Sequence, residues 1–165
     1  MHVTPIHQTS VSLGLDQNCT MRTLMLQNRS DPFVPLREIV QLHYEGWPDF
    51  GTPAEAATIV SLVRLLRDVI ISCGKLDAPV LVHCSAGCGR TGTFCTIDYV
   101  MNAVDEGMAE GEEDLIYRKV LALREQRMSL VQTLRQYVLC YDCVLYHILG
   151  KLTMSSDEHA EMKMG

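Results

Sequence analysis

The sequence lacks the features that would tie it to a membrane or to nucleic acid. No apolar run approaches the roughly 20 residues needed to span a bilayer, and the most apolar stretch, 58–72, is interrupted by charged residues. No cluster of Lys and Arg stands out, and 20 acidic against 14 basic residues give a net charge of −6. We therefore expect no membrane span and no nucleic-acid partner, and any anion that the protein binds must be held locally.

The sequence also lacks an even number of regularly spaced cysteines. The chain has seven, an odd number, and they are scattered. No signal-peptide pattern opens the sequence, so a secreted disulfide framework is not expected. His83, Cys84 and Cys88 suggest metal ligation, but no second cluster with zinc-like spacing accompanies them. We predict a cytoplasmic protein that uses no metal or other cofactor.

Length and composition favour one globular domain. The 165 residues are 47% hydrophobic and 21% charged, which is ordinary for a folded domain. We predict the domain at 1–152 and a polar, disordered tail at 153–165. The first 18 residues show no clear period. Apolar periodicity predicts strands at 20–26, 36–44 and 78–82 and helices at 54–72, 90–104, 112–126 and 133–149.

The most informative stretch is 82–92, where an apolar run ends abruptly in small residues and then becomes helical. Backbone N–H groups in such a strand–loop–helix turn point inward at the positive end of the helix and hold an oxyanion. Cys84 opens the loop, and this field should lower the pKa of its thiol and leave a nucleophilic thiolate. Arg90 closes the loop and can grip two oxygens of a tetrahedral dianion. The loop therefore indicates a nucleophile beneath a bound phosphate, in preference to a buried structural thiol.

A second informative stretch is 46–53, which carries Trp47, Asp49 and Phe50. Its two glycines and two prolines exclude regular structure and predict a shaped loop. Loops of this kind often carry function. Taken alone, Asp49 could simply cap a turn, and Gln132, much further along, could lie on the solvated face of a helix.

The stretch 83–92, His-Cys-Ser-Ala-Gly-Cys-Gly-Arg-Thr-Gly, resembles the signature loop of protein tyrosine phosphatases. Trp-Pro-Asp at 47–49 resembles the mobile acid loop of that family, and Val-Gln-Thr at 131–133 resembles its glutamine loop. All three stand in the family's order and approximate spacing, and the signature variant is similar to that of the cytosolic, non-receptor type. The resemblance implies an α/β fold with a central mixed sheet flanked by helices. It also implies hydrolysis of phosphotyrosine in protein partners through a cysteinyl-phosphate intermediate, without a metal.

The resemblance also implies a role for each catalytic residue. Cys84 would attack phosphorus, and Arg90 would stabilise the oxygens of the transition state. Asp49 would protonate the leaving phenolate and then act as a base on water. Gln132 would orient that water, and Gln136 would assist.

Other residues are implied as supports of the same site. Thr91 would hydrogen-bond the Cys84 sulfur and ease its departure, and His83 would help to fix the loop. Phe50 would line the pocket wall, and Arg124 would support the site from behind. The implied phosphate-binding residues are Ser85, Ala86, Gly87, Cys88, Gly89 and Arg90, with Asp49, Phe50, Gln132 and Gln136 around them.

The resemblance covers only the C-terminal part of the family's catalytic domain. The sequence shows no counterpart of the N-terminal helices and strands, of the substrate loop whose tyrosine stacks on phosphotyrosine, or of the loop whose glutamate pairs with the signature arginine. Two other functions therefore stay open: a catalytically silent phosphotyrosine-binding fragment, and a phosphatase of relaxed specificity. Cys88 could form a reversible disulfide with oxidised Cys84 or be a tolerated small residue. The oligomeric state is not predicted.

Overall fold

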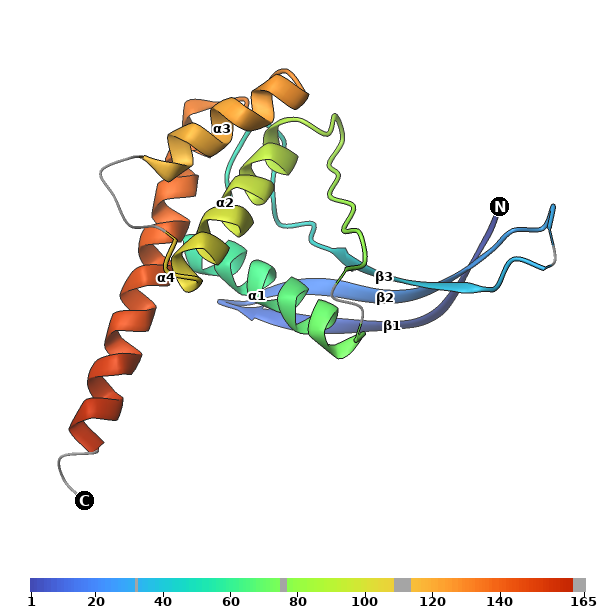
Figure 1. Cartoon of the computed structure of the whole chain (residues 1–165), viewed down its shortest axis with the longest axis horizontal. Coiled ribbons are helices and arrows are strands. Elements are labelled where there is room, and N and C mark those ends of the chain that lie inside the picture. Colours follow the sequence, from blue (N-terminus) through green and yellow to red (C-terminus); the bar gives the residue numbers. More distant parts are fainter. Residues whose placement is uncertain (32, 75–76, 109–113, 162–165) are drawn as a thin grey trace. The chain divides into compact units, whose positions relative to one another are not determined.

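The computed structural model describes residues 1–31, 33–74, 77–108 and 114–161, and these form two compact units (Figure 1). The sheet unit comprises 1–46 and 64–78, and the helical unit comprises 47–63 and 79–165. Helix α1 (Ala56–Ser72) contributes its first part to the helical unit and its second part to the sheet unit.

The sheet unit contains one antiparallel sheet with the strand order β1-β2-β3. β1 (His2–Gly14) and β2 (Gln17–Gln27) are joined by a two-residue turn, Leu15 and Asp16, whose φ angles are 50° and 58°. Positive φ at both central residues gives a turn that matches the twist of a hairpin. β2 then pairs with β3 (Arg37–His43) from Thr20 opposite His43 to Leu26 opposite Arg37. The predicted hairpin of 20–26 with 36–44 is therefore confirmed.

The sheet contains one strand that was not predicted, and one predicted strand is absent from the described residues. β1 occupies a stretch with no clear period, because most of its side chains are exposed and only main-chain pairing defines the strand. The stretch 78–82 is apolar yet irregular, with Val80 48% and Leu81 87% exposed. A strand needs a paired neighbour, and no described strand pairs with this stretch. The α/β class is confirmed, while the described sheet is antiparallel throughout instead of mixed.

The helical unit is built from the start of α1 and three further helices: α2 (Gly89–Asp105), α3 (Leu115–Gln126) and α4 (Leu134–Glu161). All four predicted helices are confirmed; residues 112–113 of the third lie outside the described residues, and α4 runs beyond its predicted end at 149 into the segment predicted as a tail. Asp114 caps α3 by accepting a 2.9 Å hydrogen bond from the Tyr117 N–H, as capping residues do.

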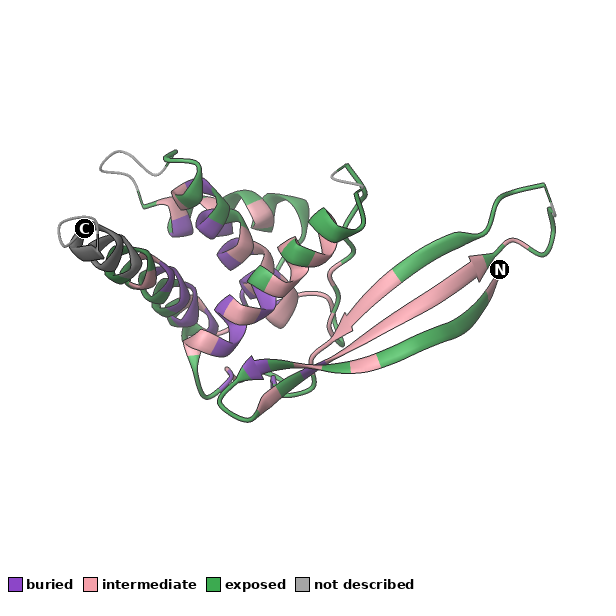
Figure 2. Ribbon diagram, turned by 90° about the horizontal axis from the view of Figure 1, so that it is seen from below, coloured by how far each residue is buried: buried purple, intermediate pink, exposed green. Residues whose placement is uncertain are grey.

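The hydrophobic core lies mainly in the helical unit. Figure 2 shows buried positions where α2 and α4 pack together, and Ile97 and Met101 of α2 are 0% exposed. Each such side chain stabilises the fold by about 1.5–3 kcal/mol. Among the described hydrophobic residues of the sheet unit, only Leu13 and Cys19 are buried. α2 is therefore a fixed platform for the loop at its N-terminus. None of the described helices is long and apolar enough to cross a membrane.

Candidate active site

The loop that Cys84 opens and Arg90 closes, called the phosphate loop below, leads directly into α2, whose first residue is Gly89. Gly87 has a φ of 67°, a left-handed conformation that favours glycine. Cys88 stands at the N-cap position, and its side chain makes no capping hydrogen bond. The first N–H groups of α2 therefore keep their capacity to bind an anion in the loop.

Cys84 has the electrostatics of a nucleophile. Partial burial would raise the pKa of its thiol, but hydrogen bonds from the Thr91 side chain and from the N–H groups of Thr91, Cys88 and Gly87 outweigh burial and lower the pKa to about 6. The Thr91 hydroxyl is buried, and among the described residues none accepts from it at ordinary hydrogen-bond geometry, which leaves it available to the Cys84 sulfur. At neutral pH the sulfur is therefore mostly thiolate, as the sequence predicted.

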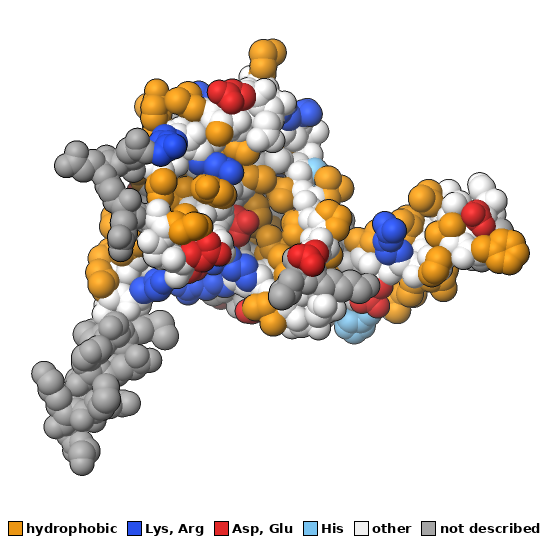
Figure 3. Space-filling view, in the orientation of Figure 1, with side chains coloured by type: hydrophobic (Ala, Val, Ile, Leu, Met, Phe, Trp, Pro, Cys, Tyr) orange, Lys and Arg blue, Asp and Glu red, His pale blue; other side chains and the backbone are white. Residues whose placement is uncertain are grey.

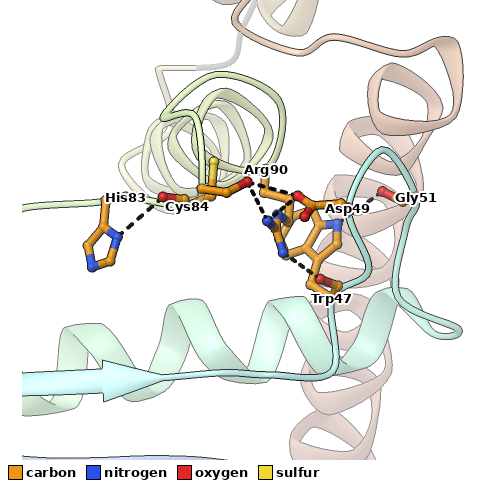
Figure 4. A network of polar contacts seen from close by, with 7 residues as sticks. Trp47, Asp49, Gly51, His83, Cys84 and Arg90 are labelled. Atoms are coloured by element: carbon orange, nitrogen blue, oxygen red, sulfur yellow. Dashed lines mark hydrogen bonds and ion pairs between the residues drawn. The ribbon is translucent and has the colours of Figure 1, made fainter.

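Arg90 joins the phosphate loop to the acid loop at 47–51, as Figure 4 shows. Its Nη1 donates to the Trp47 carbonyl at 2.8 Å, and its Nη2 donates to Ser85 Oγ at 3.0 Å and pairs with the Asp49 carboxylate. Ser85 Oγ also donates to Asp49 Oδ1 at 3.0 Å. A carboxylate thus already lies against the guanidinium, which is placed to bind an oxyanion.

The acid loop is a short turn with one buried anchor. Trp47 is 6% exposed, and its Nε1 donates to the Gly51 carbonyl at 3.1 Å. The Gly51 N–H donates back to the Pro48 carbonyl at 3.3 Å. Phe50 has a φ of 57°, which is uncommon for an aromatic residue. These contacts turn the Asp49 carboxylate toward Arg90, although its side chain stays 59% exposed.

The glutamine loop is held from behind by α3 and α4. Arg124 Nε donates to the Leu130 carbonyl at 2.9 Å, and its Nη2 donates to the Val131 carbonyl at 2.8 Å. Gln136 is 0% exposed, and its Oε1 accepts from the N–H of Gln132 at 2.9 Å. Val131 is 1% exposed with a φ of 59°, a strained conformation for a β-branched residue. The loop is therefore fixed by its surroundings.

Gln132 lies over the start of α2. A Cβ added to Gly89 would come within 2.7 Å of Gln132 Oε1 and 2.9 Å of Gln136 Nε2, so both amides approach the helix N-terminus closely. The structure thus brings Gln132 to the phosphate loop, as predicted. Gln136 lies below the surface, where the contacts of its Oε1 support the glutamine loop.

His83 and Phe50 lie at the margin of the candidate active site. The exposed His83 ring has its Nδ1 3.4 Å from the Cys84 carbonyl oxygen, and Figure 4 shows it directed away from Arg90 and Asp49. Phe50 is 69% exposed and borders an open cavity of about 590 Å³. The cavity is lined by Phe50, Arg124, Met128, Ser129, Val131, Gln132 and Thr133.

Two residues make contacts at the site that the sequence did not predict. Ser85, expected only as a loop member, bridges Asp49 and Arg90 through its hydroxyl. Arg127 Nη2 donates to the Ala86 carbonyl at 3.0 Å and lies beside Gly87, so it supports the phosphate loop from α3. The only signal in the sequence was the arginine pair at 124 and 127 ahead of the glutamine loop.

Comparisons with known proteins agree with this geometry. The sequence profile described as Protein-tyrosine phosphatase matches residues 2–146. The chain belongs to the protein-tyrosine phosphatase family. Human receptor-type tyrosine-protein phosphatase alpha is 37% identical over 142 residues, which are 84% of this chain and 17% of that protein. Tyrosine-protein phosphatase corkscrew of Drosophila melanogaster is 32% identical over 158 residues, 94% of this chain and 18% of that protein.

Among solved structures, the catalytic domain of human protein tyrosine phosphatase non-receptor type 18 superposes with a TM-score of 0.71 at 34% identity. The match covers 86% of this chain and 47% of that one. The chain thus spans under a fifth of these two curated phosphatases and about half of the solved catalytic domain.

Proposed function

We propose that this chain is a protein tyrosine phosphatase that hydrolyses phosphotyrosine through a cysteinyl-phosphate intermediate. One observation carries the proposal: the Cys84 thiol, with its pKa lowered to about 6, shares a loop with Arg90, and Arg90 in turn contacts Asp49. A nucleophile, an anion-binding cation and a proton donor are thereby assembled at one helix N-terminus.

In the first step the Cys84 thiolate attacks phosphorus and forms the S–P bond, while the bond from phosphorus to the phenolic oxygen breaks. The electron pair of that bond goes to the phenolic oxygen, which takes a proton from Asp49. Arg90 exchanges its contact with the Asp49 carboxylate for contacts with two phosphoryl oxygens, because the protonated acid no longer competes for the guanidinium.

In the second step water attacks the cysteinyl phosphate. Asp49, now a carboxylate, accepts a proton from the water as the new P–O bond forms. The S–P bond breaks, its electron pair returns to the Cys84 sulfur, and inorganic phosphate leaves. Thr91 stabilises the departing thiolate, and Gln132, which lies over Gly89, orients the water.

The test is Cys84→Ser with p-nitrophenyl phosphate as the substrate. We expect turnover to be lost, because a serine hydroxyl stays protonated in this field, whereas rapid acid quenching of the unaltered protein should trap a phosphorylated Cys84 peptide. Cys73→Ser is the matched control, since Cys73 is an exposed thiol in the sheet unit. Turnover that survives the Cys84 change would refute the mechanism.

We propose phosphotyrosine-containing proteins as substrates and the cytoplasm as the compartment. All seven cysteines are free thiols, and a reducing compartment would keep Cys84 in its active form. Human tyrosine-protein phosphatase non-receptor type 12, 36% identical over 124 residues, is consistent with this placement.

A second function is favoured by one observation, namely that the chain corresponds to 47% of a solved catalytic domain. A chain with the phosphate loop and an incomplete pocket would bind phosphotyrosine without turning it over. Titration with a phosphotyrosine peptide alongside the turnover assay separates the two functions. Binding in the absence of turnover would favour the silent phosphotyrosine-binding protein.

A further inference from the structure

The peptide group between Ala86 and Gly87 makes contacts on both of its sides. Its N–H, which belongs to Gly87, donates a hydrogen bond to the Cys84 sulfur. Its carbonyl, which belongs to Ala86, accepts a hydrogen bond from Arg127 Nη2 at 3.0 Å. The peptide is trans, so its N–H and its carbonyl point in opposite directions. A contact that fixes the carbonyl therefore also fixes the direction of the N–H.

This peptide needs to be fixed, because a glycine lies on one side of it. Gly87 has a φ of 67°, and glycine adopts positive and negative φ about equally well. A change of sign at Gly87, with a matching rotation at Ala86, would turn the peptide over, as between turns of types I and II. The N–H would then leave the sulfur. Cys88 Sγ also donates to the Ala86 carbonyl, at 3.4 Å, but a thiol is a weak donor, so the guanidinium is the stronger contact.

Arg127 is itself held in place by the end of α3. It is the C-cap residue, and its backbone N–H donates to the Leu123 carbonyl at 3.0 Å. Its guanidinium lies along Gly87, because a Cβ added there would be 3.6 Å from Nη2 and 3.9 Å from Nε. Figure 3 shows Lys and Arg side chains at the surface of the helical unit. Arg127 is exposed as well, but its guanidinium contacts the backbone of a catalytic loop.

We propose that Arg127 is a positioning residue of the active site, which holds the Ala86 carbonyl and thereby keeps the Gly87 N–H directed at the Cys84 sulfur. A bound phosphoryl group would lie against the same inward-facing N–H groups of the loop. This role rests on the proposed function only for that second contact, because the hydrogen bond to the sulfur exists without substrate.

The effect should pass through the peptide and not through the charge of the guanidinium. The other ionisable side chains around the sulfur are Arg90, which pairs with Asp49, Cys88 in the same loop, and His83, whose ring lies against the Cys84 carbonyl oxygen. The pKa of the Cys84 thiol is raised by burial and lowered by hydrogen bonds. Loss of one of these hydrogen bonds should therefore raise the pKa at any salt concentration.

The test is the pH at which Cys84 becomes reactive toward iodoacetamide, followed on the Cys84 peptide of the full chain by mass spectrometry. Arg127→Met removes the donor and keeps an unbranched stem. We expect the midpoint to rise by about half a pH unit to one pH unit, which is an about three- to tenfold loss of thiolate below the midpoint. The rise should be equal at low and high salt, because salt screens exposed charges. Arg127→Lys can still donate to the carbonyl and should reverse part of the rise.

Arg135→Met is the matched control, because it removes the same charge from an exposed arginine of α4 in the same unit. Its midpoint should equal that of the unaltered chain. An unchanged midpoint in Arg127→Met with unaltered far-UV circular dichroism would overturn the proposal. A rise that high salt abolishes, or an equal rise in Arg135→Met, would overturn it as well.

Two further arrangements keep the test decisive. If Arg127→Met lowers the helical circular dichroism, Arg127→Gln takes its place, since this shorter polar side chain also withdraws the guanidinium from the loop. The alkylation midpoint does not depend on turnover. If the unaltered chain fails to hydrolyse p-nitrophenyl phosphate, the proposed phosphatase function fails, while the midpoint still decides whether Arg127 positions the peptide.

Discussion

The two loops that meet at Arg90 are built differently. The phosphate loop runs into a helix with a buried face, and Arg127, at the C-cap of α3, supports it by donating to the Ala86 carbonyl. The acid loop has one buried anchor, Trp47, and it leaves Asp49 and Phe50 largely exposed. Three of the contacts that hold the acid loop in place involve the phosphate loop through Arg90 and Ser85.

This difference assigns a separate task to each loop. A rigid phosphate loop supplies fixed N–H groups and a thiolate, so it requires little reorganisation when charge develops on phosphorus. An acid loop held by a few exposed polar contacts can release Arg90 to a substrate and return, as mobile catalytic loops do. Substitutions should therefore separate anion binding from proton transfer.

The largest expected effect is that of Arg90→Ala, because this residue belongs to both loops. Turnover of p-nitrophenyl phosphate should fall by about 10³-fold, in line with the loss of a principal transition-state donor. Trp47 is the only tryptophan of the chain, and its fluorescence should change as its carbonyl loses the Arg90 contact. Arg29→Ala, at an exposed loop arginine, is the control. Lost turnover with unchanged fluorescence would show that Arg90 does not hold the acid loop.

Asp49→Asn should affect proton transfer while sparing the phosphate loop. We expect kcat to fall by about 10²-fold for phenols that leave poorly as anions, and by much less for p-nitrophenol. Affinity for inorganic phosphate should be kept or increased, because Asp49 no longer competes for Arg90. Asp16→Asn, in the exposed β1–β2 turn, is the matched control. Equal losses for all leaving groups would exclude Asp49 as the acid.

The pH at which activity rises should depend on Cys84 and not on Asp49. Activity should rise with pH through about 6, because Cys84 must be deprotonated and its pKa is lowered to about 6. In Asp49→Asn this rise should stay at the same pH, because it reports the Cys84 thiol, which the substitution leaves in place. The measurement is kcat/KM for p-nitrophenyl phosphate against pH, and a displaced midpoint would contradict the assignment of the rise to Cys84.

The helices could be predicted from the sequence because their signals are local. The candidate phosphate loop was likewise inferred without reference to distant residues, from the spacing of Cys84 and Arg90 ahead of a helix. The apolar periods of α1 to α4 likewise identify a buried face directly. Even there, the end of α4 was placed too early, because the apolar pattern stops before the helix does.

Features that depend on distant partners were missed. Ser85 and Asp49 are 36 positions apart in the sequence, and Arg127 and Ala86 are 41 positions apart. Neither composition nor apolar periodicity indicates contacts between residues so far apart. β1 was not predicted, because its side chains are mostly exposed and its sequence shows no alternation of apolar residues. The run 78–82 was predicted as a strand from apolarity alone, and apolarity does not supply the neighbour with which a strand must pair.

Thr91→Ala should remove a hydroxyl that stabilises the Cys84 thiolate. Without the hydroxyl, the pKa of Cys84 should rise from about 6 toward its ordinary value of 9.0. At pH values between these two, less thiolate should form. The measurement is the rate of alkylation of Cys84 by iodoacetamide against pH, followed on the Cys84 peptide by mass spectrometry. Thr91→Ser keeps the hydroxyl and should restore the lower midpoint, whereas an unchanged midpoint in Thr91→Ala would remove Thr91 from this role.

The smallest effect should come from Ser85→Ala, which removes only the bridge between the two loops. A net hydrogen bond contributes about 0.5–1.5 kcal/mol, so we expect the population with Asp49 on Arg90 to fall by roughly two- to tenfold. The Cys84 alkylation midpoint should stay the same, because no Ser85 contact stabilises the thiolate. Quenching of Trp47 fluorescence by acrylamide should rise as the acid loop leaves Arg90 more often. If quenching stays the same and the alkylation midpoint moves, Ser85 belongs to the phosphate loop alone, and the acid loop depends on Arg90 without a bridge.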